Sequence, residues 1–316
     1  MSNDRTILVV DGLNLFIRSY AAFPTMNAHG EQVGGSIGFL RSLRKIVNEV
    51  QPSQVYVAWE GGGSTKRRGL YSEYKMGRKP EKLNRFYEDD IPDTDENKMK
   101  QIVHLLKYLK CLPVCQLYAP DCEGDDVIAY LVNGPLKNER VVIASSDKDM
   151  YQLIDDRVSV YSFHKKKFIT PKDVFEEFKV TSNNFALAKA LCGDTNDNVP
   201  GVKGLGFKTL TKKFPLLGTQ SNLILQDIFD YCSAHSDESP VYKRILESSN
   251  DVKRNWRLVY LDVASLSPTQ ISRIDNMLNT FVPSTDRMGL IQLIIKDGIP
   301  DFDVIDYVTA FSCIHV

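Results

Sequence analysis

The sequence has few cysteines, and none lies in a metal-binding arrangement. Its six cysteines are scattered through 316 residues without a CxxC pair or zinc-ribbon spacing. This pattern gives no support to a structural zinc site. Cysteines scattered in this way are typical of the reduced thiols of a cytosolic protein, so a cytoplasmic location is expected.

Long apolar runs are missing as well. No stretch approaches the ~18 apolar residues that a membrane-spanning helix needs. The start, "MSNDRTILVVDG", lacks a basic region followed by an apolar segment and a cleavage site, so no signal peptide is expected. The formal net charge is only −1. A near-zero total neither suggests nor excludes a nucleic-acid partner, because local charge governs such binding.

Short apolar runs alternate with helical periodicity in the first half of the chain. Runs rich in β-branched or aromatic residues predict strands at residues 6–10, 54–59, 112–118, 140–146 and 158–163. The segments between them have the apolar spacing of helices. This alternation predicts an α/β fold with a largely parallel sheet. After Pro171 the pattern is mostly helical, so we place a sheet domain at 1–178 and a helical domain at 179–316.

Acidic residues follow the ends of the predicted strands. Four segments of the sheet domain and one of the helical domain contribute them. They are Asp11, Glu60, Glu123, Asp125, Asp126, Asp147, Asp149, Asp194 and Asp197. The functional crevice of an open parallel sheet lies beyond the carboxyl ends of its strands. We therefore expect these acids to meet at one edge of the sheet.

Two explanations of these acids compete. Asp147 alone would be read as a helix N-cap, and acids in a first helical turn gain roughly 0.3–1 kcal/mol each from the macrodipole. Five converging groups are harder to explain in this way, because carboxylates a few ångströms apart repel one another by a comparable amount. A divalent cation removes the repulsion, and carboxylates without His or Cys favour Mg²⁺ or Mn²⁺. Two such ions about 3.5–4 Å apart form a phosphodiester-cleaving site.

Positive charge is concentrated in residues 64–85. This segment has eight basic and two acidic residues, a local charge of +6, with tyrosines interleaved. A solvated loop is one interpretation. Because this segment begins just after Glu60, we favour a channel that follows the backbone of single-stranded nucleic acid and stacks its bases. The candidate nucleic-acid contacts are Arg67, Arg68, Tyr74 and Lys79. Lys75 and Arg78 are candidates for neutralising the phosphate during cleavage.

A glycine-rich turn, "NVPGVKGLGFKTLTKKF", occupies residues 198–214. Glycines let a backbone approach phosphate closely, and the helix that follows offers free N–H groups. An ordinary turn between helices is the alternative. The lysines after the turn and "GDTNDN" before it favour a helix–hairpin–helix that contacts duplex backbone without reading sequence. The candidate contacts are Gly201, Lys203, Gly204, Gly206, Lys208 and Lys212.

Taken together, these stretches resemble the structure-specific 5′ nucleases. That family includes flap endonucleases, the 5′–3′ exonuclease domain of bacterial DNA polymerase I, and bacteriophage enzymes such as phage ribonuclease H. The matching stretches are "VVDGLNLFIRSY", "EGGGSTKRRGLYSEYKMGRK", "CEGDDVIAYL", "SSDKDMYQL" and "GDTNDNVPGVKGLGFKTL". They occur in the family's order, from residue 8 to about residue 214.

The resemblance implies a PIN-type (resolvase-like) α/β domain with a helical arch at about 64–95, followed by a helix–hairpin–helix domain. It also implies two Mg²⁺ ions, for which Mn²⁺ can substitute, and a K⁺ ion at the glycine turn. The residues that resemble ligands of one divalent ion are Asp11, Glu123, Asp125 and Asp147. Those nearer the second ion are Asp149, Asp194 and Asp197. Asp126 is implied either as a ligand or as a residue that contacts a ligand without binding the ion. Lys75 and Arg78 match the basic residues of the arch.

One position departs from the family, which usually has Asp where this chain has Glu60. Glu is one methylene longer, so binding through water or a shifted ion is expected there. The chain ends about 100 residues after the glycine turn, so a stand-alone, monomeric nuclease is expected, as in phages, in the host cytoplasm. Its implied substrates are DNA flaps, nicks and RNA–DNA primers in replication. Its implied protein partners are single-strand-binding and replication proteins.

Two other functions remain open at this point. A non-catalytic protein that binds branched DNA would explain the change at Glu60, but it would be expected to lose several acids. A PIN-type ribonuclease for single-stranded RNA would lack the glycine turn and the pair Asp194 and Asp197. The sequence has all of these features, which favours the 5′ nuclease.

Overall fold

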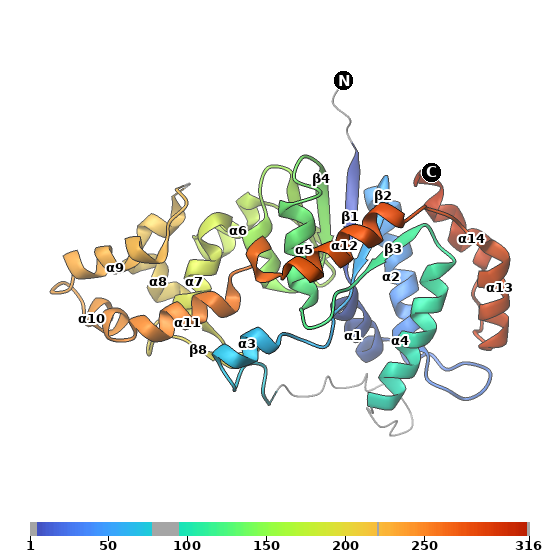
Figure 1. Cartoon of the computed structure of the whole chain (residues 1–316), viewed down its shortest axis with the longest axis horizontal. Helices are drawn as coiled ribbons and strands as arrows, with labels where there is room; N and C mark the ends of the chain where they lie inside the picture. Colours follow the sequence, from blue (N-terminus) through green and yellow to red (C-terminus); the bar gives the residue numbers. More distant parts are fainter. Residues whose placement is uncertain (1–4, 78–94, 220, 315–316) are drawn as a thin grey trace.

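A six-stranded sheet forms the centre of the protein (Figure 1). The computed structural model describes residues 5–77, 95–219 and 221–314. The strand order is β3-β2-β1-β4-β5-β6, and every neighbouring pair is parallel except β5 with β6. The strands are β1 (Thr6–Asp11), β2 (Gln54–Ala58), β3 (Val114–Leu117), β4 (Arg140–Ala144), β5 (Val158–Ser162) and β6 (Lys167–Ile169).

The two central strands are apolar because helices cover both faces of the sheet. In β1 every residue after Thr6 is buried. Successive side chains of a strand point to opposite faces. Leu8 and Val10 accordingly belong to one core cluster, and Ile7 and Val9 belong to another. The chain leaves β1 for β2 and β3, then returns to the other side of β1 to form β4, which creates a topological switch point between β1 and β4.

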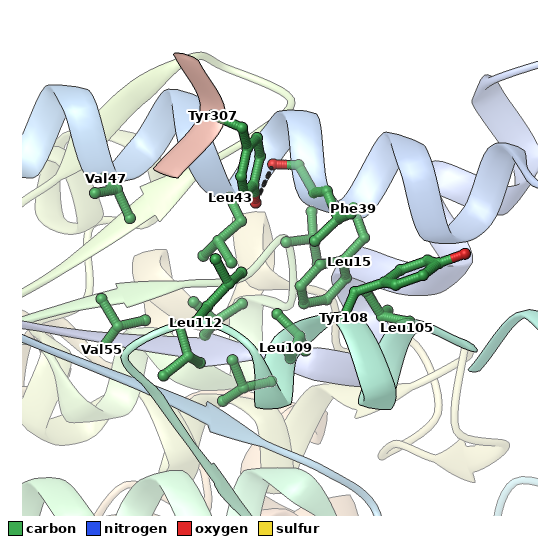
Figure 2. Packing of buried hydrophobic residues seen from close by; sticks show 14 of the residues in the cluster. Leu15, Phe39, Leu43, Val47, Val55, Leu105, Tyr108, Leu109, Leu112 and Tyr307 are labelled. Carbon is green, nitrogen blue, oxygen red and sulfur yellow. Dashed lines mark hydrogen bonds between the residues drawn. The ribbon is translucent and has the colours of Figure 1, made fainter. Parts of the chain in front are cut away.

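One face of the sheet is covered by helices from both ends of the chain. These are α1 (Gly12–Ala22), α2 (Gly34–Val50), α4 (Asp95–Lys110), α13 (Arg287–Lys296) and α14 (Val304–Thr309). Figure 2 shows Leu43 of α2 and Leu109 of α4 in this core, with Tyr307 of α14 beside them. The Tyr307 hydroxyl donates a hydrogen bond to the Leu40 carbonyl at 3.1 Å, so its one polar atom is satisfied in the interior.

The opposite face carries the second core cluster. Its main covering elements are α5 (Gly124–Asn133), the 3₁₀-helix η1 (Lys148–Leu153), α6 (Pro171–Phe178) and α12 (Pro268–Thr280). Val127, Ile128 and Leu131 of α5 are fully buried there. Their spacing of one, three and four positions places them on one side of a helix. The apolar side of α5 faces the sheet, and because α5 follows β3, its acidic first turn lies at the carboxyl edge of the strands.

A helical half lies beyond the sheet, at the left of Figure 1. It contains a two-stranded hairpin, β7 (Gly193–Asp194) with β8 (Val199–Pro200). Its helices are α7 (Phe185–Cys192), α8 (Phe207–Lys213), α9 (Leu225–Ala234), α10 (Pro240–Glu247) and α11 (Ser249–Val259). A separate core holds these helices together, with Leu187, Leu210 and Phe214 fully buried. Short 3₁₀ turns, η2 (Ser182–Asn184) and η3 (Pro215–Gly218), connect the helices.

The chain after about residue 260 returns to the sheet. It comprises η4 (Val263–Ser265), α12, α13, α14 and η5 (Ala310–Cys313). Ile274 of α12 packs in the core under α5, and Leu290 of α13 packs in the core with α2. Helices α12, α13 and α14 thus contribute apolar side chains to the two cores of the sheet half. Whereas a helical domain at 179–316 was expected from the sequence, we propose that the helical half ends near residue 259.

The expected α/β class with a mostly parallel sheet is confirmed. All five predicted strands are present, with ends that differ by one or two residues. The short antiparallel strand β6 was not predicted, because "KFI" (167–169) is too brief to show a pattern. Among the residues described, no helix combines the length and the apolar character needed to cross a bilayer.

Candidate active site

The site begins at the switch point, where β1 and β4 end. Asp11 is the last residue of β1 and the N-cap of α1; its Oδ1 accepts a hydrogen bond from the Asn14 amide at 3.1 Å. Asp147 follows β4 and caps η1, accepting from the Asp149 amide at 2.9 Å. Both acids therefore are the helix caps that local sequence suggests. In each cap one carboxylate oxygen accepts the backbone amide.

Asp11 is almost fully buried, at 6% exposed. Its Oδ2 accepts from the Ser145 hydroxyl at 2.9 Å. Burial raises the pKa of Asp11 to about 6, although the hydrogen bonds from Asn14 and Ser145 oppose this; the charges of Asp147 and Glu60 raise it further. The structure thus brings acids from β1, β2 and β4 close enough to repel one another, as the strand ends predicted.

The first turn of α5 brings three more acids. Glu123 caps the helix, and the Asp126 carboxylate reaches back to the Glu123 amide at 3.2 Å. Asp125 lies between them. Burial raises the pKa of Asp125 well above its ordinary value, and the charges of Asp147 and Asp11 add to the effect. Asp125 therefore belongs electrostatically to the acids at the switch point.

Glu123 and Asp126 face a buried arginine. Arg67 lies on α3 (Thr65–Leu70), and its two terminal nitrogens reach the Asp126 carboxylate at 2.7 Å each. The same side chain lies 2.9 Å from Glu123 Oε2. Burial lowers the pKa of Arg67, but Asp126 and Glu123 raise it overall, so the guanidinium remains charged. Both oxygens of Asp126 are engaged by this guanidinium.

The helical half brings the last acids to the same place. Carboxylate oxygens of Asp149, Asp194 and Asp197 all lie within 4.8 Å of one another. Asp149 comes from η1, whereas the other two belong to the β7–β8 hairpin. This hairpin is tight: a side chain at Gly201 would meet the Cys192 carbonyl oxygen at 2.0 Å. Glycine is therefore required for the turn that places Asp194 and Asp197 beside the sheet.

A lysine lies between these acids. Lys189 of α7 is 7% exposed and forms ion pairs with Asp149 and Asp194. Burial lowers the pKa of Lys189, but the two carboxylates raise it overall. Burial raises the pKa of Asp149 to about 7 despite Lys189. The pKa of Asp194 is lowered, because Lys189 and backbone amides outweigh its burial. One ammonium group therefore leaves the cluster short of positive charge.

Lys75 contacts the acids directly, as expected for a residue beside the site. Its Nζ lies 2.8 Å from Glu123 Oε2 and 4.0 Å from Asp197 Oδ2. Its backbone has φ of 59°, a left-handed conformation that is uncommon for a residue other than glycine. A hydrogen bond from its amide to the Asp197 carbonyl, at 2.9 Å, holds that conformation.

Two residues predicted to contact nucleic acid, Arg67 and Tyr74, are buried in the structure. Arg67 is buried and paired with acids, as described above. Tyr74 is 5% exposed, and its ring packs with Ala190, Val199 and Leu258. Its hydroxyl lies 3.1 Å from Glu123 Oε2 and 3.3 Å from Asp197 Oδ2. Neither side chain has a free face for a base or phosphate, because the acids and the helical half already cover them.

The other predicted contacts have different positions. Arg68 is exposed near Gly62, and Glu60 is exposed after β2. Lys203, Lys208 and Lys212 are exposed on and after the glycine turn. Gly204 has φ of 77°, and Gly206 precedes α8. Arg78 and Lys79 lie outside the described residues.

The residue that sequence reasoning missed is Lys189. It is the only charged residue in the otherwise apolar helix "FALAKALC", five positions before Asp194. A charge on an apolar helix is seldom buried without a partner. That pattern, read together with the acids that follow, indicates a buried ion pair.

The donor set fits hard divalent cations. All the candidate ligands are carboxylates from separate segments, and Mg²⁺ and Mn²⁺ prefer oxygen ligands of this kind. The raised pKa values of Asp11, Asp125 and Asp149 share burial and mutual repulsion as causes. A cation among them would remove that repulsion. The site therefore has the chemistry of a divalent-metal centre at the edge of a resolvase-like sheet.

Comparison with known proteins agrees with this class. Residues 6–179 match the family described as 5′–3′ exonuclease, N-terminal resolvase-like domain. The chain is 30% identical over 257 residues to a flap endonuclease, Xni, of Shewanella woodyi, covering 81% of this chain and 92% of that protein. It is 31% identical over 222 residues to a 5′–3′ exonuclease of Aquifex aeolicus, covering 70% and 72%. The chain belongs to the 5′–3′ exonuclease and flap endonuclease family, as its motifs indicated.

Other relatives are longer. DNA polymerase I of Deinococcus radiodurans is 32% identical over 255 residues, and the match covers 80% of this chain but 25% of the polymerase. The chain thus spans about a quarter of the bacterial polymerases that it matches. Among solved structures, a bacteriophage T5 D15 protein crystallised with metal ions superposes with a TM-score of 0.65 at 21% identity, covering 92% of this chain and 99% of that one. At this identity the likeness shows the fold alone.

The raised pKa values predict that the metal-free protein loses stability with rising pH. Asp11 and Asp149 hold protons in the fold up to pH ~6–7, whereas in the unfolded chain they ionise near pH 4. Folding therefore binds protons in this range. Ionisation of Asp11 and Asp149 lowers the free energy of unfolding by about 3 kcal/mol between pH ~5.5 and ~8. In EDTA, we expect the melting temperature to be about 5 °C lower at the higher pH.

Scanning calorimetry would measure this. Asp11→Asn should weaken the dependence, and added Mg²⁺ should raise the melting temperature most at the higher pH. A melting temperature that increased with pH in EDTA would contradict the charge distribution described here.

Proposed function

We propose that this chain is a metal-dependent, structure-specific 5′ nuclease that hydrolyses phosphodiester bonds of DNA flaps and nicks and of RNA–DNA primers. The observation that carries the proposal is the meeting of acids from the sheet edge and from the β7–β8 hairpin. Asp149, Asp194 and Asp197 come within 4.8 Å although they span both halves of the molecule. Family membership supports the same activity.

The proposed ligands fall into two groups. Asp11, Glu123, Asp125 and Asp147 would hold one Mg²⁺ or Mn²⁺ ion. Asp149, Asp194 and Asp197 would hold a second. Bound ions of this kind supply a nucleophilic water at neutral pH and stabilise the leaving oxygen. A T5 structure described as holding DNA and metal ions is consistent with this assignment.

The remaining acids have supporting roles in this proposal. Asp126 positions Glu123 through Arg67, because both of its oxygens contact that guanidinium. Glu60 is exposed, and its longer side chain suits an indirect contact through water. Lys189 keeps Asp149 and Asp194 close together by pairing with both.

Lys75 is proposed to stabilise the phosphate during cleavage. Its ammonium group is held beside Glu123 and Asp197, so a phosphate that reaches the acids must pass close to it. Arg68, Arg78 and Lys79 would guide the single 5′ strand toward the site. A positive groove of this type binds backbone without selecting a base sequence.

The glycine turn is proposed to hold the duplex. Lys203, Lys208 and Lys212 are exposed near Gly201, Gly204 and Gly206, where backbone can approach a phosphate and where a K⁺ ion would find carbonyl ligands. The catalytic core of Rad2, solved with DNA, shares this fold with a TM-score of 0.54 at 16% identity. We further propose that the protein acts in replication as a cytoplasmic monomer. Its proposed partners are single-strand-binding and replication proteins.

An end-labelled 5′ flap, incubated with and without Mg²⁺ and sized on a gel, tests the function. Cleavage near the flap junction only with Mg²⁺ is expected. Binding without cleavage would favour a non-catalytic DNA-binding protein. Cleavage of single-stranded RNA in preference to the flap would favour a PIN-type ribonuclease.

Asp147 provides a direct test of the proposed metal ligands. Asp147→Asn keeps the shape and the helix cap but removes one ligand charge. The rate of cleavage should therefore fall by at least ~100-fold, which is more than the loss expected when a residue that only orients a ligand is changed. Affinity for the flap in Ca²⁺, measured by fluorescence anisotropy, should change little. Full activity in this variant would refute the metal assignment.

Lys75 provides a test of phosphate stabilisation. Lys75→Ala should slow single-turnover cleavage by about 10²-fold, because it removes positive charge where the transition state gains negative charge. Substrate affinity should fall far less. A lower affinity with an unchanged single-turnover rate would exclude this role and assign Lys75 to binding.

Lys208 provides a test of duplex binding by the glycine turn. Lys208→Ala should weaken duplex binding and reduce the slope of log K against log salt by about one unit, since one phosphate contact is lost. Lys45→Ala is a matched control, because Lys45 is exposed on α2, which packs on the sheet and not in the helical half (Figure 1). Equal slopes for the wild type and Lys208→Ala would rule out this contact.

A further inference from the structure

The segment from Asn255 to Leu261, within "NWRLVYLD", contacts three acid-bearing parts of the site although none of its own side chains is acidic. We call residues 255–261 the α11 brace. It comprises the last turn of α11 and the two residues that follow. In Figure 1, α11 runs beside α7 and α3, and the packing of the chain confirms both neighbours.

The first contact of the α11 brace is with the hairpin that carries Asp194 and Asp197. Asn255 is 1% exposed. Its amide nitrogen donates to the Ala190 carbonyl at 3.1 Å and to the Pro200 carbonyl at 2.7 Å. Ala190 precedes β7, and Pro200 is the last residue of β8. One side chain therefore joins the chain entering the hairpin to the chain leaving it.

The second contact is with Arg67. The Leu258 carbonyl, one helical turn after Asn255, accepts from Arg67 Nε at 3.1 Å. The opposite end of that guanidinium holds Glu123 and Asp126. Because Nε is occupied by the backbone of the α11 brace, the orientation in which Arg67 meets the α5 acids depends on where the brace lies.

The third contact is with η1, which follows Asp147 and contains Asp149. Gln152 donates from Nε2 to the Val259 carbonyl at 3.0 Å and accepts from the Leu261 amide at 2.9 Å. A paired amide contact of this kind fixes both direction and distance. The three anchors lie within seven consecutive residues, so the spacing between the three groups of acids is set by a single stretch of backbone.

We infer that the α11 brace is a positioning element that sets the separation of the metal-binding acids, with Asn255 and Gln152 as its positioning residues. The inference rests on the proposed function for the identity of the ions. Acids that repel one another need a rigid support to stay at the distance that suits a cation. Groups that orient ligands typically change metal affinity by about 10–100-fold when they are removed.

The test compares two buried asparagines. Asn255→Leu keeps the size of the side chain and removes the donor. Asn184→Leu is the control, because Asn184 is fully buried and also donates to backbone carbonyls, those of Leu217 and Thr219, which belong to neither the β7–β8 hairpin nor η1. Both variants should lower the melting temperature by similar amounts. Calorimetric titration with Mn²⁺ should show about tenfold weaker binding only for Asn255→Leu.

Gln152→Met provides a second measurement that does not depend on folding of the Asn255 variant. It leaves the Val259 carbonyl and Leu261 amide unpaired and should also weaken Mn²⁺ binding by about tenfold. In both variants the Mg²⁺ concentration for half-maximal cleavage should rise more than the rate at saturating Mg²⁺ falls. Unchanged Mn²⁺ affinity in Gln152→Met, or an equal loss in Asn184→Leu and Asn255→Leu, would overturn the inference.

Failure of the proposed function gives a different result. A wild-type protein that binds Mn²⁺ but cleaves no flap would contradict the nuclease, while the comparison of Mn²⁺ affinities would still decide the role of the α11 brace. A wild-type protein that cleaves the flap, with Mn²⁺ affinity insensitive to Asn255→Leu and Gln152→Met, would overturn the α11 brace alone.

Discussion

Repulsion among carboxylates at the edge of the sheet is the constraint on which the rest of the structure depends. Burial raises the pKa values of Asp11 and Asp149, and each acid makes its neighbours harder to ionise. Two buried cations, Arg67 and Lys189, offset part of this charge, each by pairing with two acids. Their partners are Glu123, Asp126, Asp149 and Asp194, so the acids around the switch point still share an excess of negative charge.

The distribution of those cations links the two halves of the molecule. Lys189 belongs to the helical half but pairs with Asp149 of the sheet half. Arg67 lies on α3 and reaches both the α5 acids and the Leu258 carbonyl of α11. The Lys189–Asp149 pair forms only when the helical half packs against the sheet, and the same packing brings the Leu258 carbonyl to Arg67. The charged site is therefore part of the interface that holds the halves together, and its geometry depends on that packing.

Much of this arrangement could be predicted because parallel sheets have a simple rule. Acids that follow strands, such as Asp11 and Asp147, must lie at the carboxyl edge wherever the strands are parallel. The burial of Arg67 and Tyr74 could not be predicted, because the +6 charge of residues 64–85 describes a segment and not the environment of one side chain. The return of α12–α14 to the sheet was also missed, because an amphipathic helix does not reveal which surface it covers.

The same repulsion couples cation binding to the stability of the fold. Ionising Asp11 or Asp149 without a cation costs free energy, because both are buried among like charges. A cation that binds the ionised acids recovers this cost and adds its own attraction, so binding stabilises the native state by mass action. A tighter ion pair at Lys189 would stabilise the metal-free fold but would also compete with the cation for Asp149. The pairing of Lys189 with Asp149 is thus a compromise between a stable empty site and an open one.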